Sequence, residues 1–356
     1  MKKILKLLGI VIVLLIIYLL IWPVPIDPVA WTPPEAPALE GQYAANDYLK
    51  DVERIGVGMG IGPEDVAIDD KGRIYGGYED GRIIRFQNDG SNPEIFADTQ
   101  GRPLGMHFDA NGNLIVADSQ KGLLSISPEG VIKVLTTQAA GLPFGFTDDV
   151  DVAADGVIYF SDASYKFGQL NYTADLLEHR PNGRLLSFDP KTKVTKVILD
   201  SLYFANGVAI SPDQSFVLVN ETGKYRITRY WLSGPDQGKS ELFIDNLPGF
   251  PDGISSDEKE TFWLAIASPR KPELDALMPK PFIRKIIMRL PGFLQPAPVY
   301  HSFVLGLNLQ GDVIHNLQDG SLDCYRVTTS VQEHDGMLYI GSLEEDSIAR
   351  IAVPGN

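Results

Sequence analysis

The sequence predicts an all-β fold, a six-bladed β-propeller closed by an N-terminal strand and preceded by an N-terminal transmembrane helix. The first observation is a strand motif, clearest at residues 204–213 (FANGVAISPD), that recurs in altered form along the chain. Each copy starts at a leading residue, and these are Glu64, Leu104, Asp148, Asn206 and Asp252. Strand motifs that recur every 40 to 58 residues are typical of propeller blades.

The second observation is the order of strands inside each repeat. After its leading residue, the first repeat has a polar turn at 69–72 and further strands near 73–77, 82–86 and 94–97. This order is a four-stranded meander, the usual propeller blade. The last repeat ends one strand short, whereas residues 51–57 precede the first repeat and have no blade of their own. We therefore expect residues 51–57 to complete the sixth blade, which would leave no exposed sheet edge.

The third observation concerns the N-terminus. Lys2, Lys3 and Lys6 precede an uncharged stretch at 7–22, and Pro23 ends any helix. This pattern predicts a single-pass anchor, with a cleaved signal peptide as the alternative because the stretch is short for a membrane span. Lysines of this kind stay in the cytoplasm, which places the propeller on the non-cytoplasmic side. The predicted organisation is a transmembrane anchor at 1–22, a proline-rich linker at 23–45 and the propeller at 46–356.

Charge and cysteine content limit the function classes. Without the three anchor lysines, 28 basic and 46 acidic residues remain, a net charge of −18 for the body. A surface this acidic repels polyanions, so we expect no nucleic-acid partner. Cys324 is the single cysteine, which excludes an intramolecular disulfide.

The leading residues are the candidate functional group. Inner strands of a propeller line its central channel, so residues at matched positions converge there. Glu64, Asp148, Asn206 and Asp252 would bring together three carboxylates and an amide oxygen. Two carboxylates about 4 Å apart repel by about 4 kcal/mol at an effective dielectric of 20, so three of them require a cation. An all-oxygen set favours Ca²⁺; the alternative is that Asp and Asn are simply common where strands meet loops.

These positions also carry a family resemblance. The motifs are GPE at 62–64, TDDV at 147–150, ANGVAIS at 205–211, FPDGIS at 250–255, IYFSDAS at 158–164 and QEHDG at 332–336. They resemble the SMP-30/gluconolactonase, paraoxonase and strictosidine synthase-like superfamily over roughly residues 50–353. The anchor is most similar to that of adipocyte plasma membrane-associated protein-like members. The resemblance implies a six-bladed propeller, calcium ligands at residues 64, 148, 206 and 252, and a calcium-dependent esterase or lactonase of the arylesterase type.

The chain departs from that superfamily at several positions. Leu104 stands where paraoxonases have a catalytic His, and His107 lies three residues further on. Gly253 replaces an Asn ligand of paraoxonases, and Asp148 stands where relatives often have Asn. Strictosidine synthases use a Glu that falls near Thr329, so the sequence argues against amine–aldehyde condensation.

The mechanism that we infer for the activity implied by this resemblance is ester or lactone hydrolysis at calcium. The ion would polarise the carbonyl and stabilise the developing oxyanion. Asp252 would act as ligand and as nucleophile or base, with Asp148 as the second candidate base. The alternative function is a non-catalytic, calcium-stabilised propeller that binds an apolar ligand or a protein partner.

Two connections are unusually long, at 163–183 and 267–302, and we expect both on the face where the leading residues begin the inner strands. The second contains an amphipathic stretch with apolar residues on one helical face and Arg284, Lys285 and Arg289 beside it. This stretch predicts a lid over an apolar substrate, or a membrane contact through residues 281–294. The alternative is a helix packed on the propeller rim.

Overall fold

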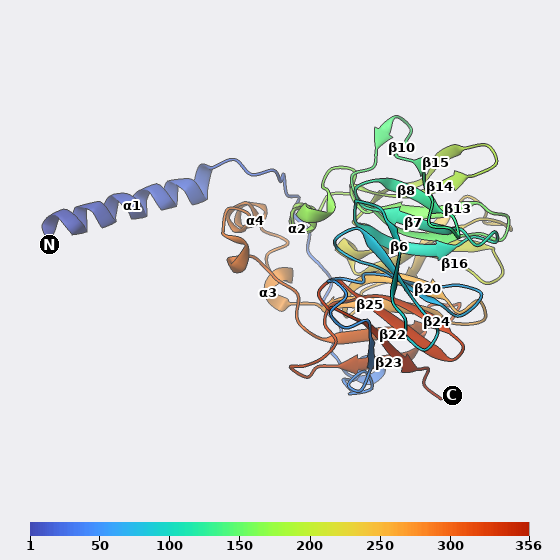
Figure 1. Cartoon of the computed structure of the whole chain (residues 1–356). Helices are drawn as coiled ribbons and strands as arrows, with labels where there is room; N and C mark the ends of the chain where they lie inside the picture. The colour runs from blue at the N-terminus through green and yellow to red at the C-terminus, as the bar shows by residue number, and fades with distance from the viewer. Residues whose placement is uncertain (356) are drawn as a thin grey trace.

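The predicted propeller is confirmed. The computed structural model describes residues 1–355, which form six four-stranded antiparallel sheets around one axis and one two-stranded hairpin (Figure 1). In blades 1 to 5 the strands follow one another from the axis outwards, so consecutive strands pair and the inner strand comes first in the chain; in blade 6 the outermost strand is β1, the first strand of the chain.

The strands of each blade are as follows. Blade 1 contains β2 (Val66–Ile68), β3 (Ile74–Gly77), β4 (Arg82–Phe86) and β5 (Glu94–Asp98). Blade 2 contains β6 (Pro103–Phe108), β7 (Leu114–Asp118), β8 (Gly122–Ile126) and β9 (Ile132–Thr136). Blade 3 contains β12 (Thr147–Val152), β13 (Ile158–Asp162), β14 (Gly183–Asp189) and β15 (Val194–Leu202).

The remaining blades complete the ring. Blade 4 contains β16 (Ala205–Ile210), β17 (Phe216–Glu221), β18 (Arg226–Trp231) and β19 (Ser240–Ile244). Blade 5 contains β20 (Gly249–Ser256), β21 (Phe262–Pro269), β22 (Ser302–Leu307) and β23 (Val313–Asp319). Blade 6 contains β24 (Thr328–His334), β25 (Met337–Ser342), β26 (Ile348–Ala352) and β1 (Glu53–Ile55). The small hairpin is β10 (Gln138–Ala139) and β11 (Leu142–Pro143).

The ring closes as the sequence predicts. Strand β1, inside the expected range 51–57, pairs antiparallel with β26, with Glu53 opposite Arg350. The Arg350 guanidinium donates to the Glu53 carboxylate at 2.8–2.9 Å. A chain that joins its first strand to its last sheet in this way leaves no blade with an unpaired inner edge.

The core lies between the blades. The second strands are buried from end to end, as in β7 and β17, because a blade packs on each side of them. Their sequences, LIVAD and FVLVNE, are accordingly apolar without alternation. The outermost strands, such as β5 and β19, leave part of their apolar residues exposed.

The inner strands are interrupted at the leading residues. The pairing register shifts between residues 103 and 106 in β6, 147 and 150 in β12, 205 and 208 in β16, 251 and 254 in β20, and 328 and 330 in β24. A bulge of this kind redirects one side chain out of the alternating pattern. The residues inside the bulges are Leu104, Asp148, Asn206, Asp252 and Thr329, and Glu64 directly precedes β2.

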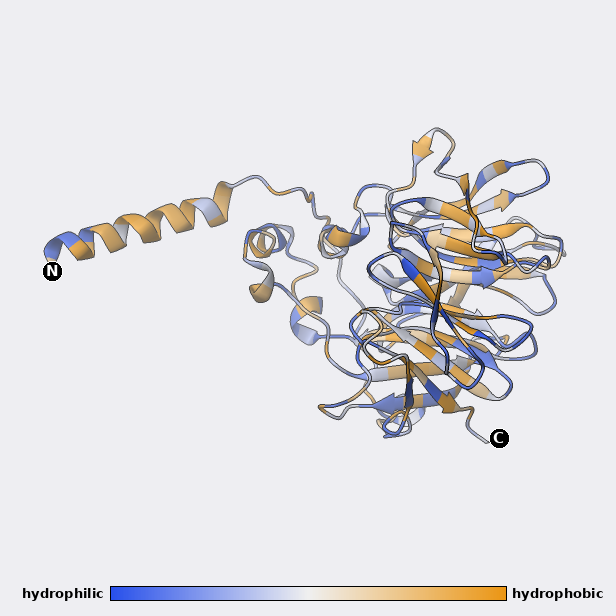
Figure 2. Cartoon of the chain, in the orientation of Figure 1, coloured by the Kyte–Doolittle hydropathy of each residue, from blue (hydrophilic) through white to orange (hydrophobic). Residues whose placement is uncertain are grey.

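The N-terminal helix α1 (Lys2–Ile21) has no buried residues and a mean hydropathy of 3.1, and it is the one helix among the described residues long and apolar enough to cross a membrane. Figure 2 shows it as apolar along nearly its whole length, except for the lysine-bearing end. A signal-anchor has this composition.

Three short helices cover the face where the inner strands begin, which we call the leading face. They are α2 (Tyr172–Glu178), α3 (Pro272–Asp275) and α4 (Pro281–Ile287). Figure 1 shows them between the propeller and α1. The expected position of both long connections is therefore confirmed, and α2 contacts α4 across the two connections.

The segment that follows α1 packs against these helices. Trp31 stacks on His179 with ring centroids 4.2 Å apart, and Ile26 is buried. Further on, the one-turn 3₁₀ helix η1 (Gly41–Tyr43) buries Tyr43 in the apolar cluster of blades 4 and 5. The proline-rich stretch is extended, as its composition predicts, and it lies along the domain.

The basic residues of the second long connection point inwards, contrary to a simple basic surface patch. Arg284 is fully buried and donates to the carbonyl oxygens of Leu177 and Val29. Arg289 donates to the carbonyl oxygens of Leu19 (2.9 Å) and Trp22 (2.6 Å), at the end of α1. Amphipathic spacing alone could not show that these guanidinium groups have backbone partners in the N-terminal segment.

Close packing at the ring closure gives a first prediction. A Cβ at Gly341 would lie under 3.0 Å from the Glu64 carbonyl oxygen and from Ser330 Oγ. Gly341→Ala should therefore lower the free energy of unfolding by at least about 2 kcal/mol, because the backbone of blade 1 must move. Chemical denaturation of the full chain in detergent measures this.

The matched control is Gly292→Ala, since a Cβ at Gly292 meets nothing within 4 Å and the residue has no left-handed backbone. Its unfolding free energy should stay within about 0.5 kcal/mol of the parent. Equal stability of the two variants would contradict the packing described for residue 341.

Candidate functional site

The four predicted ligand residues line one cavity. Glu64, Asp148, Asn206 and Asp252 all face a space of about 150 Å³ beneath the helices of the leading face. Each side chain is buried, with 4–8% of its surface exposed. They come from blades 1, 3, 4 and 5, and the bulges in β12, β16 and β20 hold three of them at this level.

Neighbouring blades fix the backbone at these positions. The Asn220 side chain of β17 donates to the Asp252 carbonyl oxygen, and Thr222 Oγ1 donates to that of Pro251 at 2.6 Å. Thr329 Oγ1 of β24 donates to the Glu64 carbonyl oxygen at 2.7 Å. Because blade 4 holds the bulge of blade 5 and blade 6 holds the start of blade 1, the site depends on ring closure.

Burial raises the pKa of all three carboxyl groups, and repulsion from neighbouring carboxylates adds to it for Glu64 and Asp148. Burial is the largest cause for Glu64, followed by the charges of Asp148 and Asp252. Burial is also the largest cause for Asp148, with Asp252 next. The pKa of Asp252 rises to about 7 through burial, although hydrogen bonds from Asn206 and the Gly253 backbone act in the opposite direction.

Arg102 is a guanidinium close to this group. It lowers the pKa of Glu64 and Asp148, but less than burial and the other carboxylates raise it. Its Nη1 donates to the carbonyl oxygens of Gly62 (2.8 Å) and Gly77 (3.3 Å). One partly engaged cation does not balance three carboxylates, so the site favours protons or a metal ion.

The donor set fits calcium in its chemistry. Asp148 Oδ2 is buried without a hydrogen-bond partner, and Asn206 adds an amide oxygen to the carboxylates. Within residues 1–355 no three His, Cys, Asp or Glu side chains form a group that could hold a metal, so the carboxylates line the cavity without converging on one point. Calcium accepts six to eight oxygen ligands in flexible geometry, which suits such a mixed set.

The rest of the cavity is apolar. Its wall is formed by Leu104, Phe146, Tyr172, Leu176, Phe204, Phe250, Met278, Val327 and Leu343. Residues from the two long connections contribute, among them Leu274 and Pro298. An apolar cavity with a few polar groups at one end is typical of a small-molecule site.

The departures from the resembled superfamily are visible in the structure. Leu104 is buried and packs against Phe146 and Phe204, so an apolar side chain occupies the position of the paraoxonase His. His107 lines a different cavity, with Nδ1 3.4 Å from Asp151 Oδ1. At Gly253 a Cβ would lie 2.5 Å from the Thr329 carbonyl oxygen, so no side chain fits there.

Sequence reasoning missed a second acidic layer. Asp65 and Asp149, one residue after their leading residues, line a larger cavity of about 310 Å³ to which all six blades contribute and which Glu64, Asp148 and Asn206 also line. Asp65 Oδ2 accepts from the Met106 amide and Asp149 Oδ2 from the Val208 amide, both at 2.7 Å. Each carboxylate therefore ties its blade to the next. The signal in the sequence was a second carboxylate directly after the first, because consecutive side chains of a strand point to opposite sides.

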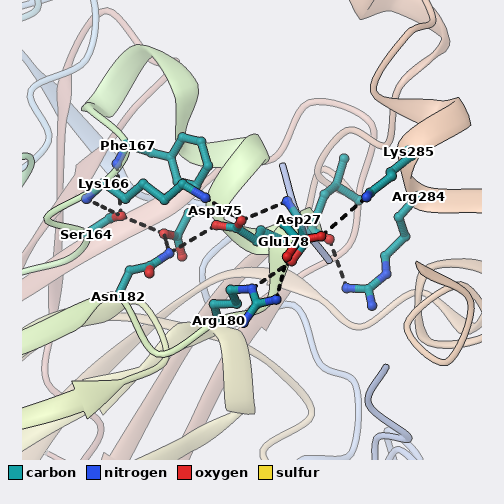
Figure 3. Close-up of polar contacts among 11 residues, drawn as sticks. Asp27, Ser164, Lys166, Phe167, Asp175, Glu178, Arg180, Asn182, Arg284 and Lys285 are labelled. Carbon is teal, nitrogen blue, oxygen red and sulfur yellow. Dashed lines mark hydrogen bonds and ion pairs between the residues drawn. The ribbon is translucent and has the colours of Figure 1, made fainter. Parts of the chain in front are cut away.

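Asp175 of α2 gives a prediction about pH. Burial raises its pKa to about 6, although it accepts hydrogen bonds from Ser164 Oγ (2.6 Å) and Asn182 Nδ2 (2.9 Å), as Figure 3 shows. An acid whose pKa is raised in the folded state stabilises the protein fully below its unfolded pKa of 3.8. That stability is lost as the pH rises through 6.

Asp175→Asn should therefore be more stable than the parent at pH 8, on the order of 2 kcal/mol, and gain little at pH 4. Thermal unfolding at both values measures the difference. Asp47→Asn removes an exposed carboxylate and serves as control. A gain of equal size at pH 4 and pH 8 would show that ionisation of residue 175 is not the cause.

Comparison with solved structures agrees with the fold. A gluconolactonase from Xanthomonas campestris superposes with a TM-score of 0.62 at 17% identity, over 93% of this chain and 98% of that one. A calcium-binding protein, regucalcin, from Agrobacterium tumefaciens superposes with a TM-score of 0.59 at 13% identity, over 85% and 91%. At such identities the likeness concerns the fold alone.

Sequence comparison identifies the family. The strictosidine synthase model matches residues 148–235, and the strictosidine synthase-like N-terminal model matches residues 41–86. Strictosidine synthase-like protein 6 of Arabidopsis thaliana is 42% identical over 312 residues, 85% of this chain and 82% of the plant protein. Adipocyte plasma membrane-associated protein of Rattus norvegicus is 35% identical over 353 residues, 92% and 93% of the two chains. This chain belongs to the strictosidine synthase-like family.

Proposed function

We propose that the protein is a membrane-anchored, calcium-dependent hydrolase of esters or lactones, of the arylesterase or lactonase type. The observation that carries this proposal is the joint lining of one cavity by four oxygen donors and an apolar wall. The donors would hold Ca²⁺, and the wall would hold an apolar acyl or aryl group beside it. Such a pairing suits a carbonyl compound with little charge of its own.

Each residue has a chemical task in this proposal. Bound Ca²⁺ supplies Lewis-acid polarisation of the carbonyl and stabilisation of the developing oxyanion. Asp252, with a pKa of about 7, changes its protonation state near neutral pH and so suits the role of general base toward water, or of nucleophile. Asp148 is the second candidate base, since its Oδ2 has no hydrogen-bond partner. Leu104, Phe146 and Phe204 exclude bulk water from this end of the cavity.

The comparisons support this proposal indirectly, through the descriptions of similar proteins. One structural neighbour is described as a gluconolactonase, another as a luciferin-regenerating enzyme and a third as calcium-binding. A relative at 35% identity is named as plasma membrane-associated. The lysines in the first turns of α1 favour, under the positive-inside rule, a propeller on the non-cytoplasmic side.

A non-catalytic function has one observation in its favour. Leu104 leaves the site without a histidine base, and His107 faces the other cavity. In that case calcium would hold the inner strands together, and the apolar cavity would bind a ligand or partner. Strictosidine-type condensation has less support, because Thr329 engages the Glu64 backbone and offers no carboxylate.

Asp252→Asn tests the catalytic role. We expect it to lower calcium-dependent turnover of phenyl acetate and a lactone panel by about 100-fold or more, because it removes the base while keeping the shape of the side chain. Asp335→Asn is the control, since Asp335 lies in an exposed left-handed turn that Asn also tolerates. A folded Asp252→Asn protein with full turnover would overturn the assignment of residue 252.

Calcium itself should stabilise the protein. At a hundredfold excess over its Kd, an ion that binds only the folded state adds about 2.7 kcal/mol. The midpoint of thermal unfolding should therefore rise with calcium and fall with chelator. Asn206→Leu should abolish most of this response, whereas Asp335→Asn should keep it. A calcium response of normal size in Asn206→Leu would exclude residue 206 as a ligand.

If the parent is calcium-stabilised but turns over no ester or lactone, the non-catalytic function stands. The two experiments therefore separate the metal site from the reaction. Each is performed on the full chain in detergent, with circular dichroism as the measure of the folded fraction.

A further inference from the structure

The most exposed apolar side chains of the body gather on one face. Outside α1, the highest exposed fractions of large apolar side chains among the described residues are those of Leu322 (101%), Phe293 (86%) and Leu170 (83%). They belong to three different connections, between β23 and β24, β21 and β22, and β13 and β14. All three connections lie on the leading face, because inner strands begin and second strands end there.

These three residues, which we call the apolar ring, belong to connections that also line the candidate cavity. The neighbours of each exposed residue line the cavity: Gln169 and Tyr172 beside Leu170, and Pro296 after Phe293. Val327, in the same connection as Leu322, does so as well. The exposed tips and the cavity wall are therefore parts of the same three connections.

The membrane helix ends at the same face. Tyr18 OH of α1 donates to the Arg289 carbonyl oxygen at 3.1 Å, and Arg289 in turn donates to Leu19 and Trp22. Phe293 follows Arg289 by four residues. In Figure 1, α1 extends away from the leading face, so the bilayer that it would cross lies on that side of the propeller.

Several cations near this ring are engaged within the protein, whereas Lys280 is exposed. Arg284 is buried, Lys285 lies 3.3 Å from Asp27 Oδ1, and Arg180 pairs with the same carboxylate at 2.7 Å (Figure 3). Lys166 pairs with the buried Glu178. A body with a net charge of −18 and engaged basic side chains has no electrostatic attraction to anionic lipid. Contact with a bilayer would therefore be apolar.

We propose that the leading face docks on the bilayer through Leu170, Phe293 and Leu322, and that the cavity opens towards the lipid. The second part rests on the proposed function and names its substrate class: apolar esters or lactones dissolved in the membrane, delivered from the bilayer. Apolar docking of this kind does not depend on anionic headgroups or on ionic strength.

Lipid-quenching of fluorescence tests the docking. The full chain is reconstituted in zwitterionic phosphatidylcholine vesicles with a nitroxide on the acyl chain. A polarity-sensitive dye is placed at Leu170→Cys, Phe293→Cys or Leu322→Cys, and at Asp335→Cys on the opposite face as control. The native Cys324 is buried, so the parent chain gives the labelling blank. We expect quenching at residues 170, 293 and 322 and none at 335, unchanged in high salt.

Two results would overturn the docking. One is an absence of lipid quenching at all three positions. The other is shielding from aqueous iodide without lipid quenching, which would assign the ring to a protein partner or a second copy. Quenching that disappears in high salt would overturn the apolar nature of the contact.

Kinetics test the substrate route. The triple variant Leu170→Ser, Phe293→Ser and Leu322→Ser should keep turnover of soluble phenyl acetate and lose about tenfold or more on a long-chain ester embedded in vesicles. The matched control changes Ile95, Val131 and Leu242 to Ser, three apolar residues exposed at 50–66% on or beside outer strands. It should keep both activities. An equal loss of turnover on both substrates would overturn delivery from the bilayer. So would unchanged turnover on both.

The outcomes separate the two proposals. Quenching without any esterase activity leaves the docking standing and rejects the hydrolase. Activity without quenching leaves the hydrolase standing and rejects the docking.

Discussion

The inner strands approach one another so closely around the axis that little room remains for side chains. A Cβ at Gly207 would collide with the Asp252 carbonyl oxygen, and one at Gly105 would collide with the Asp149 backbone. Bulges in five inner strands resolve this crowding. Glu64, Asp148 and Asn206 line both the cavity under the helices and the larger cavity, whereas Asp252 lines only the first and Asp65 and Asp149 only the second. The crowded inner strands therefore bring these polar groups together around the axis.

The same constraint creates the electrostatic problem of the site. Three carboxyl groups are buried beside one guanidinium, that of Arg102, whose hydrogen bonds go to backbone carbonyl groups. Ionising them without a cation costs folding free energy, since like charges at low dielectric repel strongly. Burial raises the pKa of Asp252 to about 7, where a carboxyl group can exchange a proton at neutral pH. Burying these carboxyl groups together thus favours protons or a bound cation at the site.

Much of this arrangement could be predicted from the sequence, because strand periodicity and strand direction determine it. Blade number, the closing strand and the face that carries the long connections follow from strand periodicity and direction, and the structure confirms them. The placement of four oxygen donors on one cavity follows from their matched positions. By contrast, the inward course of Arg284 depends on backbone partners more than 100 residues away. The paired carboxylates signal that Asp65 and Asp149 face away from their leading residues, but their partners Met106 and Val208 lie in the next blades, which the local pattern does not record.

The segment that follows α1 is hydrogen-bonded to the helices that cover the cavity. Glu178 of α2 is buried, accepts from the Asp27 amide at 2.8 Å and pairs with Lys166, while its carbonyl accepts from the Val29 amide. Arg284 of α4 reaches the same stretch of chain from the other side. The residues that follow α1 therefore run between α2 and α4, two of the helices that cover the cavity. Arg289 also bonds the last turn of α1, where the helix dipole favours a cation, and so connects this helix to the same connection that lines the cavity.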